Sequence, residues 1–281
     1  MKRFCTLMAL AILVMSSPVR AEVNMGTDIP EDGLVPVIQE SLRNSMVIDE
    51  ENPFSARAVT PGARYSNVTN FLASGFSHGG STVAAFRTNM RADDLNMISG
   101  TNANQVTVSL ANFNTGTTHR AVRLRVRFWD TTGTAGAPGT YLGGFDSTAN
   151  LACPSSSVCT FTFTLGSAIT LPQNIWAGVS HDTLGTGISN SFGGTAALPT
   201  TTTQLNAMGQ GLYNPPDVGT SADRLFAAGT SSSGWAVNNP TGSIVNAPFT
   251  TAIANAGWEI VPEPASLTLV GLALLALRRR R

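Results

Sequence analysis

The chain is poor in lysine and in charge of either sign. Only 12% of its 281 residues are charged, and Lys2 is its single lysine. So few Glu, Lys and Arg residues argue against long amphipathic helices, whose polar faces need them. The body of the chain also has no lysine amine that could act as a nucleophile. Threonine, serine, asparagine and glycine are abundant instead, which favours an all-β domain with polar loops.

The first 21 residues have the features of an export signal. Lys2 and Arg3 precede an apolar stretch at residues 4–15, and small residues follow up to Ala21. This is a positive n-region, an h-region of suitable length and a small-residue cleavage site. We therefore expect a signal peptide over 1–21 that is recognised by the Sec export machinery and cleaved after Ala21.

The chain ends in a tail of three parts. A proline-rich motif comes first, then an uncharged apolar run at 267–277, then Arg278, Arg279, Arg280 and Arg281. As a helix, the run would rise roughly 16 Å, whereas a stable membrane span needs about 20 residues. The arginines would keep its end on the cytoplasmic side. We expect a short hydrophobic helix that anchors the protein transiently. The alternative is that this run is a buried helix of the fold, but four arginines at the end of a core helix would have no structural purpose.

The motif ahead of this run reads Val261, Pro262, Glu263, Pro264, Ala265 and Ser266. Its prolines break regular structure and leave an extended, protease-accessible stretch. The whole tail, 261–281, closely resembles the PEP-CTERM sorting signal of exported bacterial proteins, the substrates of exosortases. The resemblance implies processing by an exosortase, transient anchoring in the inner membrane, and a final place at the cell surface or in the extracellular polysaccharide matrix.

Removal of both signals would change the net charge. Seven of the 17 basic residues lie in them, and all 17 acidic residues lie between Glu22 and Glu263. Ten basic residues against 17 acidic ones leave a net charge of about −7. Such a protein is unsuited to nucleic acid or to anionic membranes. We therefore expect no nucleic-acid partner.

Cysteine is also scarce. Cys5 would leave with the signal peptide, so Cys153 and Cys159 remain. An even pair in an exported chain predicts a disulfide, which would close the short polar loop between the two residues. A zinc site is the alternative, but two thiols without neighbouring histidines are a poor ligand set.

Alternation of apolar and polar residues predicts the strands. The clearest case is 121–129, where Val122, Leu124, Val126 and Phe128 alternate with Arg123, Arg125 and Arg127. Period 2 places the apolar side chains on a core face and the arginines on a solvent face. Further strands are expected at 105–110, 141–145, 159–165, 175–180 and 258–261. Several short strands separated by glycine-rich turns favour an antiparallel β-sandwich over residues 61–260, jelly-roll-like in arrangement.

The flanks of this domain look different. Residues 22–60 are more charged, and Val35, Ile38, Leu42 and Met46 have helical spacing. We expect an N-terminal extension that contains one short helix at 35–47. A second short helix or turn is expected at 204–208, followed by an irregular loop up to residue 216.

The resemblance to PEP-CTERM proteins extends into the central domain. Its stretches at 125–130, 138–142 and 171–179 resemble strands of other exported PEP-CTERM proteins.

Candidate chemistry is sparse. Ser77 lies in a G-x-S-x-G pattern, and Asp130 or Asp146, then His181, follow in the chain order of α/β-hydrolases. That pattern works at a strand-to-helix elbow above a parallel sheet, and no alternation of strands and helices surrounds it here. The three histidines are far apart in sequence, so no metal site or cofactor is expected. These patterns predict a protein that is not an enzyme.

Aromatic side chains offer a different possibility. Trp129 and Trp176 lie in predicted strands and are expected in the core, whereas Trp235 and Tyr213 lie in predicted loops. Exposed aromatic rings on a β-sandwich can stack on sugars. We therefore expect a non-enzymatic protein of the surface or matrix. Binding of the host exopolysaccharide through Trp235 and Tyr213 is the alternative, and a secreted serine hydrolase is the remote one.

Overall fold

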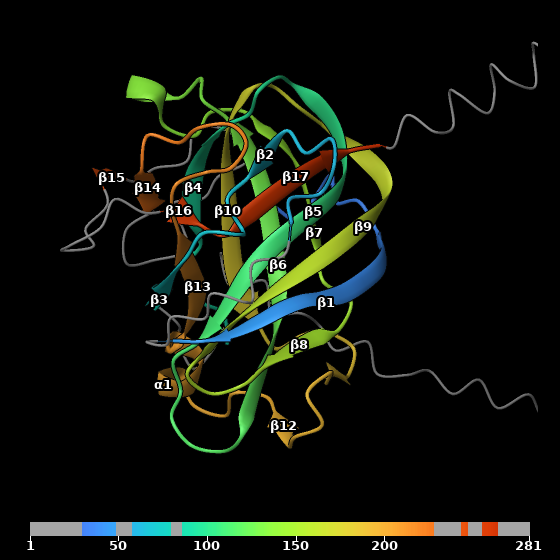
Figure 1. Ribbon diagram of the computed structural model, residues 1–281, viewed down its shortest axis with the longest axis vertical. Coiled ribbons are helices and arrows are strands. Elements are labelled where there is room, and N and C mark those ends of the chain that lie inside the picture. Colours follow the sequence, from blue (N-terminus) through green and yellow to red (C-terminus); the bar gives the residue numbers. More distant parts are fainter. Residues whose placement is uncertain (1–29, 49–57, 80–85, 228–242, 247–254, 264–281) are drawn as a thin grey trace, which may run out of the picture.

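Two β-sheets lie face to face in the computed structural model (Figure 1). The structure describes residues 30–48, 58–79, 86–227, 243–246 and 255–263. Nearly all pairing between its strands is antiparallel. The prediction of an all-β, antiparallel sandwich is confirmed. The expected signal peptide and the expected C-terminal hydrophobic helix lie outside the described residues.

The first sheet has eight strands, in which β9 and β5 form the centre and β1 lies at one edge. On its other side, β5 pairs first with β17 and then with β13. The strands of this sheet are β1 (Val37–Val47), β2 (Tyr65–Ser66), β3 (Phe71–Ser77), β5 (Thr101–Asn112), β9 (Ser157–Leu171), β13 (Met208–Tyr213), β16 (Asn255–Ala256) and β17 (Trp258–Pro262).

The second sheet has nine strands around a centre of β6 and β10. A 3₁₀ turn, η1 (Thr134–Gly136), and a short helix, α1 (Thr202–Asn206), lie in connecting segments. The strands of this sheet are β4 (Arg91–Asn96), β6 (His119–Asp130), β7 (Tyr141–Asp146), β8 (Asn150–Cys153), β10 (Asn174–Asp182), β11 (Ile188–Ser189), β12 (Ala196–Ala197), β14 (Arg224–Ala227) and β15 (Ser243–Asn246).

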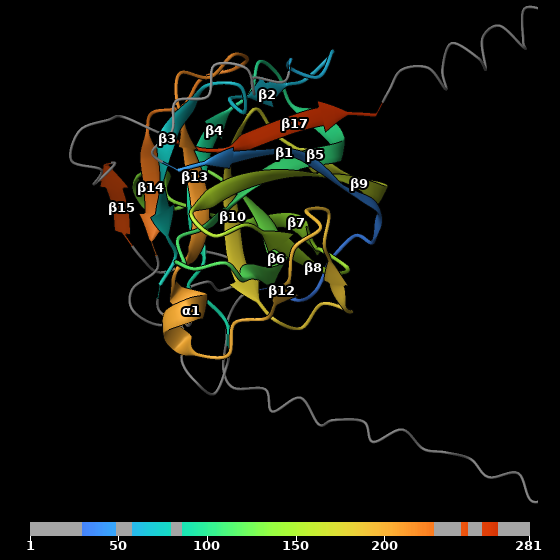
Figure 2. The same ribbon diagram turned by 60° about the horizontal axis from the view of Figure 1, so that its bottom comes forward.

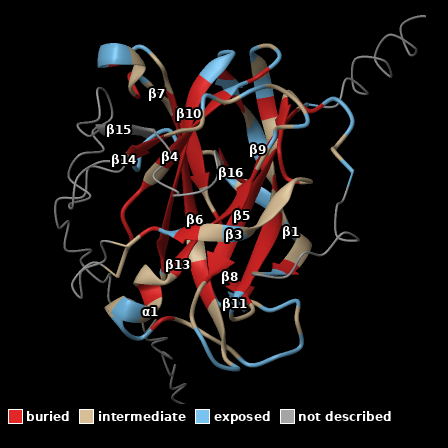
Figure 3. Cartoon of the chain, turned by 60° about the vertical axis from the view of Figure 1, so that its left-hand side comes forward, coloured by how far each residue is buried: buried red, intermediate tan, exposed pale blue. Residues whose placement is uncertain are grey.

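The main core lies between the two sheets (Figure 2), and buried residues run along the centre of the molecule (Figure 3). Val122, Leu124, Val126 and Phe128 of β6 all point into it, as their alternation predicted. Full burial of such side chains stabilises the fold by roughly 1.5–3 kcal/mol each. A smaller cluster that includes Trp129, Trp176 and Phe226 covers the outer face of the second sheet. Both tryptophans are buried, as expected.

The helix expected at 35–47 is wrong, because this segment forms β1. β1 pairs antiparallel with β9 and makes residues 37–47 an edge strand of the sandwich. Two register shifts, at Val37/Gln39 and at Leu42/Asn44, interrupt the pairing. Each bulge changes which face the next side chain occupies. The resulting apolar spacing imitates a helical period, although Ile38 is 68% exposed.

A second correction concerns the segment after α1. The loop expected there contains β13, which pairs with β5 and β3 and whose residues are all buried. Its sequence, Met-Gly-Gln-Gly-Leu-Tyr, has little strand character, and its two glycines permit a close approach to β3 and to Val158 of β9. Packing against neighbouring strands therefore overrides local propensity.

A disulfide links Cys153, at the end of β8, to Cys159, near the start of β9. Both residues are buried in the main core. The bridge therefore joins a strand of the second sheet to a strand of the first and closes the turn between them. For so short a ring, the lost entropy of the unfolded chain corresponds to about 2 kcal/mol.

Glu259 of β17 is a fully buried carboxylate with several hydrogen-bond donors around it. Arg43 of β1 forms an ion pair with it. Thr60 donates from its backbone N–H at 3.1 Å and from its hydroxyl at 2.5 Å, and the Ser66 hydroxyl donates at 2.9 Å. This one side chain thus connects β17 with β1, β2 and the segment before β2. In the sequence, its role is signalled only by its position as an isolated acid within an apolar strand.

We predict that Glu259→Gln lowers the free energy of unfolding by about 3–5 kcal/mol, because it removes the buried negative charge to which Arg43, Thr60 and Ser66 are bonded. The measurement is urea denaturation of the chain from Glu22 to Glu263. Glu263→Gln, a matched change at an exposed position, should alter stability by less than about 0.5 kcal/mol. Equal effects of the two changes would contradict the assigned role of Glu259.

Candidate functional site

The sequence motif at 261–266 begins inside the folded domain. Val261 and Pro262 are the last residues of β17, opposite Gln105 and Ala103 of β5. Val261 is only 8% exposed, Pro262 is intermediate and Glu263 is exposed. The Glu263 N–H donates to the Asn102 carbonyl over 3.3 Å. Residues 264–281, with the rest of the motif, the apolar run and the four arginines, lie outside the described residues.

The arginine face of β6 is not exposed to solvent, contrary to the prediction from its alternation. Arg125 and Arg127 are completely buried, and the side chain of Arg123 is 18% exposed. Arg123 makes a two-pronged contact with Asp182 of β10, at 2.7 and 2.6 Å. Arg127 Nη1 donates to Asp146 Oδ1 at 2.7 Å. The three arginines therefore form part of an internal ionic network.

The segment before β1 covers this network. Glu31 forms an ion pair with Arg125, and the Pro30 carbonyl accepts from Arg127 Nε at 2.5 Å. Opposing the effect of burial, Arg127 and Arg125 hold the pKa of Asp146 below its ordinary value. Burial, together with the charge of Arg125, lowers the pKa of Arg87 to about 10. Neither Glu31 nor Pro30 could be associated with β6 from sequence, because they lie nearly a hundred residues away.

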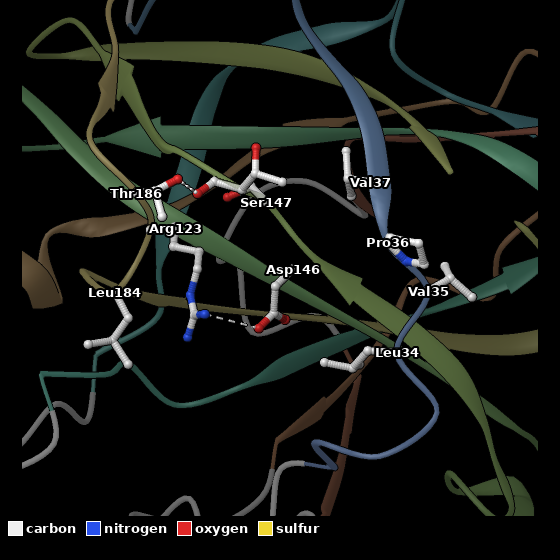
Figure 4. Close-up of a pocket in the computed structure, with 11 residues that line it drawn as sticks. Leu34, Val35, Pro36, Val37, Arg123, Asp146, Ser147, Leu184 and Thr186 are labelled. Atoms are coloured by element: carbon white, nitrogen blue, oxygen red, sulfur yellow. Dashed lines mark hydrogen bonds and ion pairs between the residues drawn. The ribbon is translucent and has the colours of Figure 1, made fainter. Parts of the chain in front are cut away.

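A cleft of about 580 Å³ opens beside the network (Figure 4). In Figure 4, Arg123 and Asp146 point toward each other, and their Nη1 and Oδ2 atoms are 3.4 Å apart. Leu34 and Leu184 form apolar walls, and Ser147, Thr148 and Thr186 add polar residues to the lining. A cleft of this size fits the volume range of small-molecule sites.

Two of the three histidines come together in the core. The ring centroids of His78 and His181 are 4.5 Å apart, and both residues are fully buried. Burial lowers the pKa of His78 well below its ordinary value, helped by the neighbouring His181 and Arg91. Burial also lowers the pKa of His181 to about 3. Both rings are thus neutral near pH 7. Within the described ranges, no three side chains of the usual metal-ligating types are grouped as a metal site would require.

The residues of the hydrolase pattern are not hydrogen-bonded to each other. Ser77 is exposed at the end of β3. The ring of His181 contacts Thr88 through Nδ1 at 3.4 Å, and its Nε2 has no hydrogen-bond partner. Asp146 belongs to the arginine network. Asp130 accepts from the Thr132 and Thr140 backbone in a turn. Asp130, Asp146 and His181 therefore have structural contacts in place of the triad.

The acidic pair Asp93-Asp94 lies in β4. Asp94 orders the segment before β14, because it accepts from the N–H groups of Ala222 and Arg224 at 3.0 and 2.8 Å. Asp93 accepts from the Ala256 N–H at 2.9 Å. Burial, followed by the nearby charge of Asp94, raises the pKa of Asp93 well above its ordinary value. These carboxylates therefore serve the fold.

The prediction that Tyr213 presents its ring to a glycan is wrong. Tyr213 ends β13 with no exposed surface, and its ring lies 5.3 Å from that of Phe71. Burial raises the pKa of its hydroxyl. It belongs to a small core cluster that also contains Met46 and Val158. Trp235, the other proposed sugar-binding residue, lies outside the described residues.

Comparison with known proteins identifies the tail. Residues 261–281 match the family model of the PEP-CTERM protein-sorting motif. No curated protein and no solved structure shows a significant match to the chain. The motif supports a protein that is exported, processed by an exosortase and sorted to the cell surface or the extracellular space. Among the described residues, no helix has the length and apolar character to cross a membrane.

The buried histidine pair predicts a loss of stability in acid. Below about pH 6.5, the histidines of the unfolded chain bind protons, whereas His78 and His181 of the folded chain stay neutral. Stability is therefore highest above pH 6.5 and falls toward pH 3, by up to about 1.4 kcal/mol per pH unit for each of the two groups.

The measurement is denaturant unfolding between pH 7.5 and 4.5. His78→Phe should reduce this slope, since one of the two groups no longer titrates. His119→Gln, at the half-buried third histidine, is the control and should retain most of the acid sensitivity. A slope unchanged by His78→Phe would contradict the assignment.

Proposed function

We propose that the exported protein is a non-enzymatic component of the cell surface or extracellular matrix. The observation that carries this proposal is that the acids and the histidine of the hydrolase pattern have structural partners. Asp146 is paired with Arg127, Asp130 holds a turn, and His181 packs against His78 in the core. A β-sandwich whose strands are joined by a disulfide and by buried hydrogen bonds fits a load-bearing or scaffolding role outside the cell.

The two ends of the chain are consistent with export and sorting of such a protein. We propose that the signal peptide at 1–21 directs the chain through the Sec machinery and that the apolar run at 267–277 holds it briefly in the inner membrane. The exosortase then acts on the tail and separates the acidic domain from Arg278–Arg281. The domain that remains carries about seven net negative charges, which favours solubility between anionic polymers rather than adsorption to them.

A second candidate function is binding of the host exopolysaccharide. The cleft beside Arg123 supports it, because it combines hydroxyl groups with an ion pair and apolar walls. Burial of Tyr213 removes one of the two aromatic residues expected to bind sugar. Trp235 is the remaining aromatic candidate.

The proposal of a non-enzymatic role predicts that Ser77→Ala restores normal matrix cohesion in a strain that lacks the gene. Ser74→Ala, at another exposed position of β3, is the matched control. Cohesion is measured as resistance of the cell aggregate or biofilm to shear. If Ser77→Ala fails while Ser74→Ala succeeds and both proteins fold, Ser77 is catalytic and the proposal is wrong.

The proposed processing is tested in the same host. Deletion of the exosortase should leave the protein longer than in the unaltered host, because its tail is retained, and should leave it in the membrane fraction.

Polysaccharide binding is tested by co-sedimentation of residues 22–263 with exopolysaccharide purified from the host. If the cleft binds sugar, Leu184→Asp should abolish co-sedimentation and Trp235→Ala should leave it intact. The reverse result would place the site at Trp235. No sedimentation of the unaltered domain would remove this candidate and leave a structural role.

A further inference from the structure

The sorting motif and the fold share residues. The PEP-CTERM match begins at Val261, whereas β17 ends at Pro262. Two residues that belong to the recognition sequence are therefore also the last two residues of a sheet strand. Such double use is a physical conflict, since a residue whose backbone and side chain are engaged by β5 cannot be bound by an enzyme at the same time.

The first part of β17 is firmly held. Trp258 and Ile260 have no exposed surface and lie in the main core. Between them, Glu259 is bonded to Arg43, Thr60 and Ser66. β17 pairs with β5 on one side and, at Glu259 and Ile260, with β2 on the other. Separation of these three residues would break the core and the ionic contact together.

The last part of β17 is held less strongly. Its pairing with β2 stops at Ile260, and a register shift separates Val261 from Pro262. Proline has no N–H to donate to the neighbouring strand. The next donor, the N–H of Glu263, makes a long contact of 3.3 Å with Asn102. In Figures 1 and 2, the tip of β17 reaches the margin of the sandwich. Ile260 thus marks the boundary between an anchored part and a detachable end.

We propose that the start of β5, residues 102–105, is an intramolecular docking surface for the start of the sorting motif, and that it competes with the exosortase for Val261 and Pro262. Processing requires these two residues to separate from β5 while Trp258–Ile260 stay in place. Enzymes and adaptor domains commonly bind extended peptides through main-chain hydrogen bonds, which a residue already paired in a sheet cannot offer. This inference rests on the proposed processing by an exosortase.

The test locks the motif to β5 in the full-length chain. The variant Gln105→Cys/Val261→Cys places two thiols at directly opposite positions of neighbouring strands, where Cβ atoms are close enough for a disulfide after a small adjustment. The matched control, Asn96→Cys/Asn174→Cys, locks β4 to β10 at an opposite pair of exposed residues in the second sheet and changes no residue of β5 or β17. Both are produced in the oxidising periplasm of a host that has an exosortase, and bridge formation is verified by thiol alkylation.

The processed fraction is measured by immunoblot, and the new C-terminus is identified by mass spectrometry. Locking at Val261 should lower processing at least about tenfold, because the binding-competent state is no longer populated. Reduction of isolated membranes should restore it, and the control should be processed as the unaltered chain is. Processing of the oxidised Val261 variant at the normal rate and bond would overturn the inference.

Two further outcomes are also decisive. If the reduced Val261 variant remains unprocessed, the substitution itself and not the lock causes the loss, and the inference is overturned. If the unaltered chain has the same length with and without the exosortase, the proposed processing fails, independently of the docking surface.

Discussion

The buried Glu259 carboxylate is the interaction on which the arrangement of the first sheet depends. Its partners come from β1, from the segment before β2 and from β2 itself, so that together with β17 four segments, with residues as far apart as 43 and 259, meet at one group. A buried charge is tolerated only where its counter-charge and hydrogen-bond donors are complete. The four segments must therefore be in place together, and none can shift by a residue without leaving the carboxylate short of a donor.

A second ionic cluster does the same for the outer face of the second sheet. Arg123, Arg125 and Arg127 would be an intolerable row of buried like charges without Asp146, Asp182 and Glu31. The N-terminal segment participates in both clusters, through Glu31 in one and Arg43 in the other. Through these two ion pairs, the N-terminal segment stabilises both sheets with contacts that lie outside the apolar core. In a chain with so few charges, a large share of those that the structure describes stabilises the fold.

Features with a local cause could be predicted from sequence, and features with a distant cause could not. The tail and the strand character of β6 could both be predicted, because each depends only on residues that are contiguous in the sequence. The burial of Arg125 was not predictable, because it depends on Glu31 from a distant part of the chain. Two bulges gave β1 the apolar spacing of a helix. Tyr213 seemed exposed because prolines follow it, yet β13 pairs with β3 and β5 and places the ring in the core.

The position of β17 also determines when the domain can become a folded body. β5 pairs with β9, some fifty residues later in the chain, and with β17, about one hundred and fifty residues later. β1 also pairs with β9 and cannot form its ladder before β9 is present. Contacts so distant in sequence form slowly, because a long loop must close before any of them gains stability. One side of β5, at residues 103–108, has no partner until residues 258–262 have emerged. A chain whose last residues are still being synthesised or translocated is thus a sandwich with a central strand that is only partly paired, and the pairing is completed when its own sorting motif arrives.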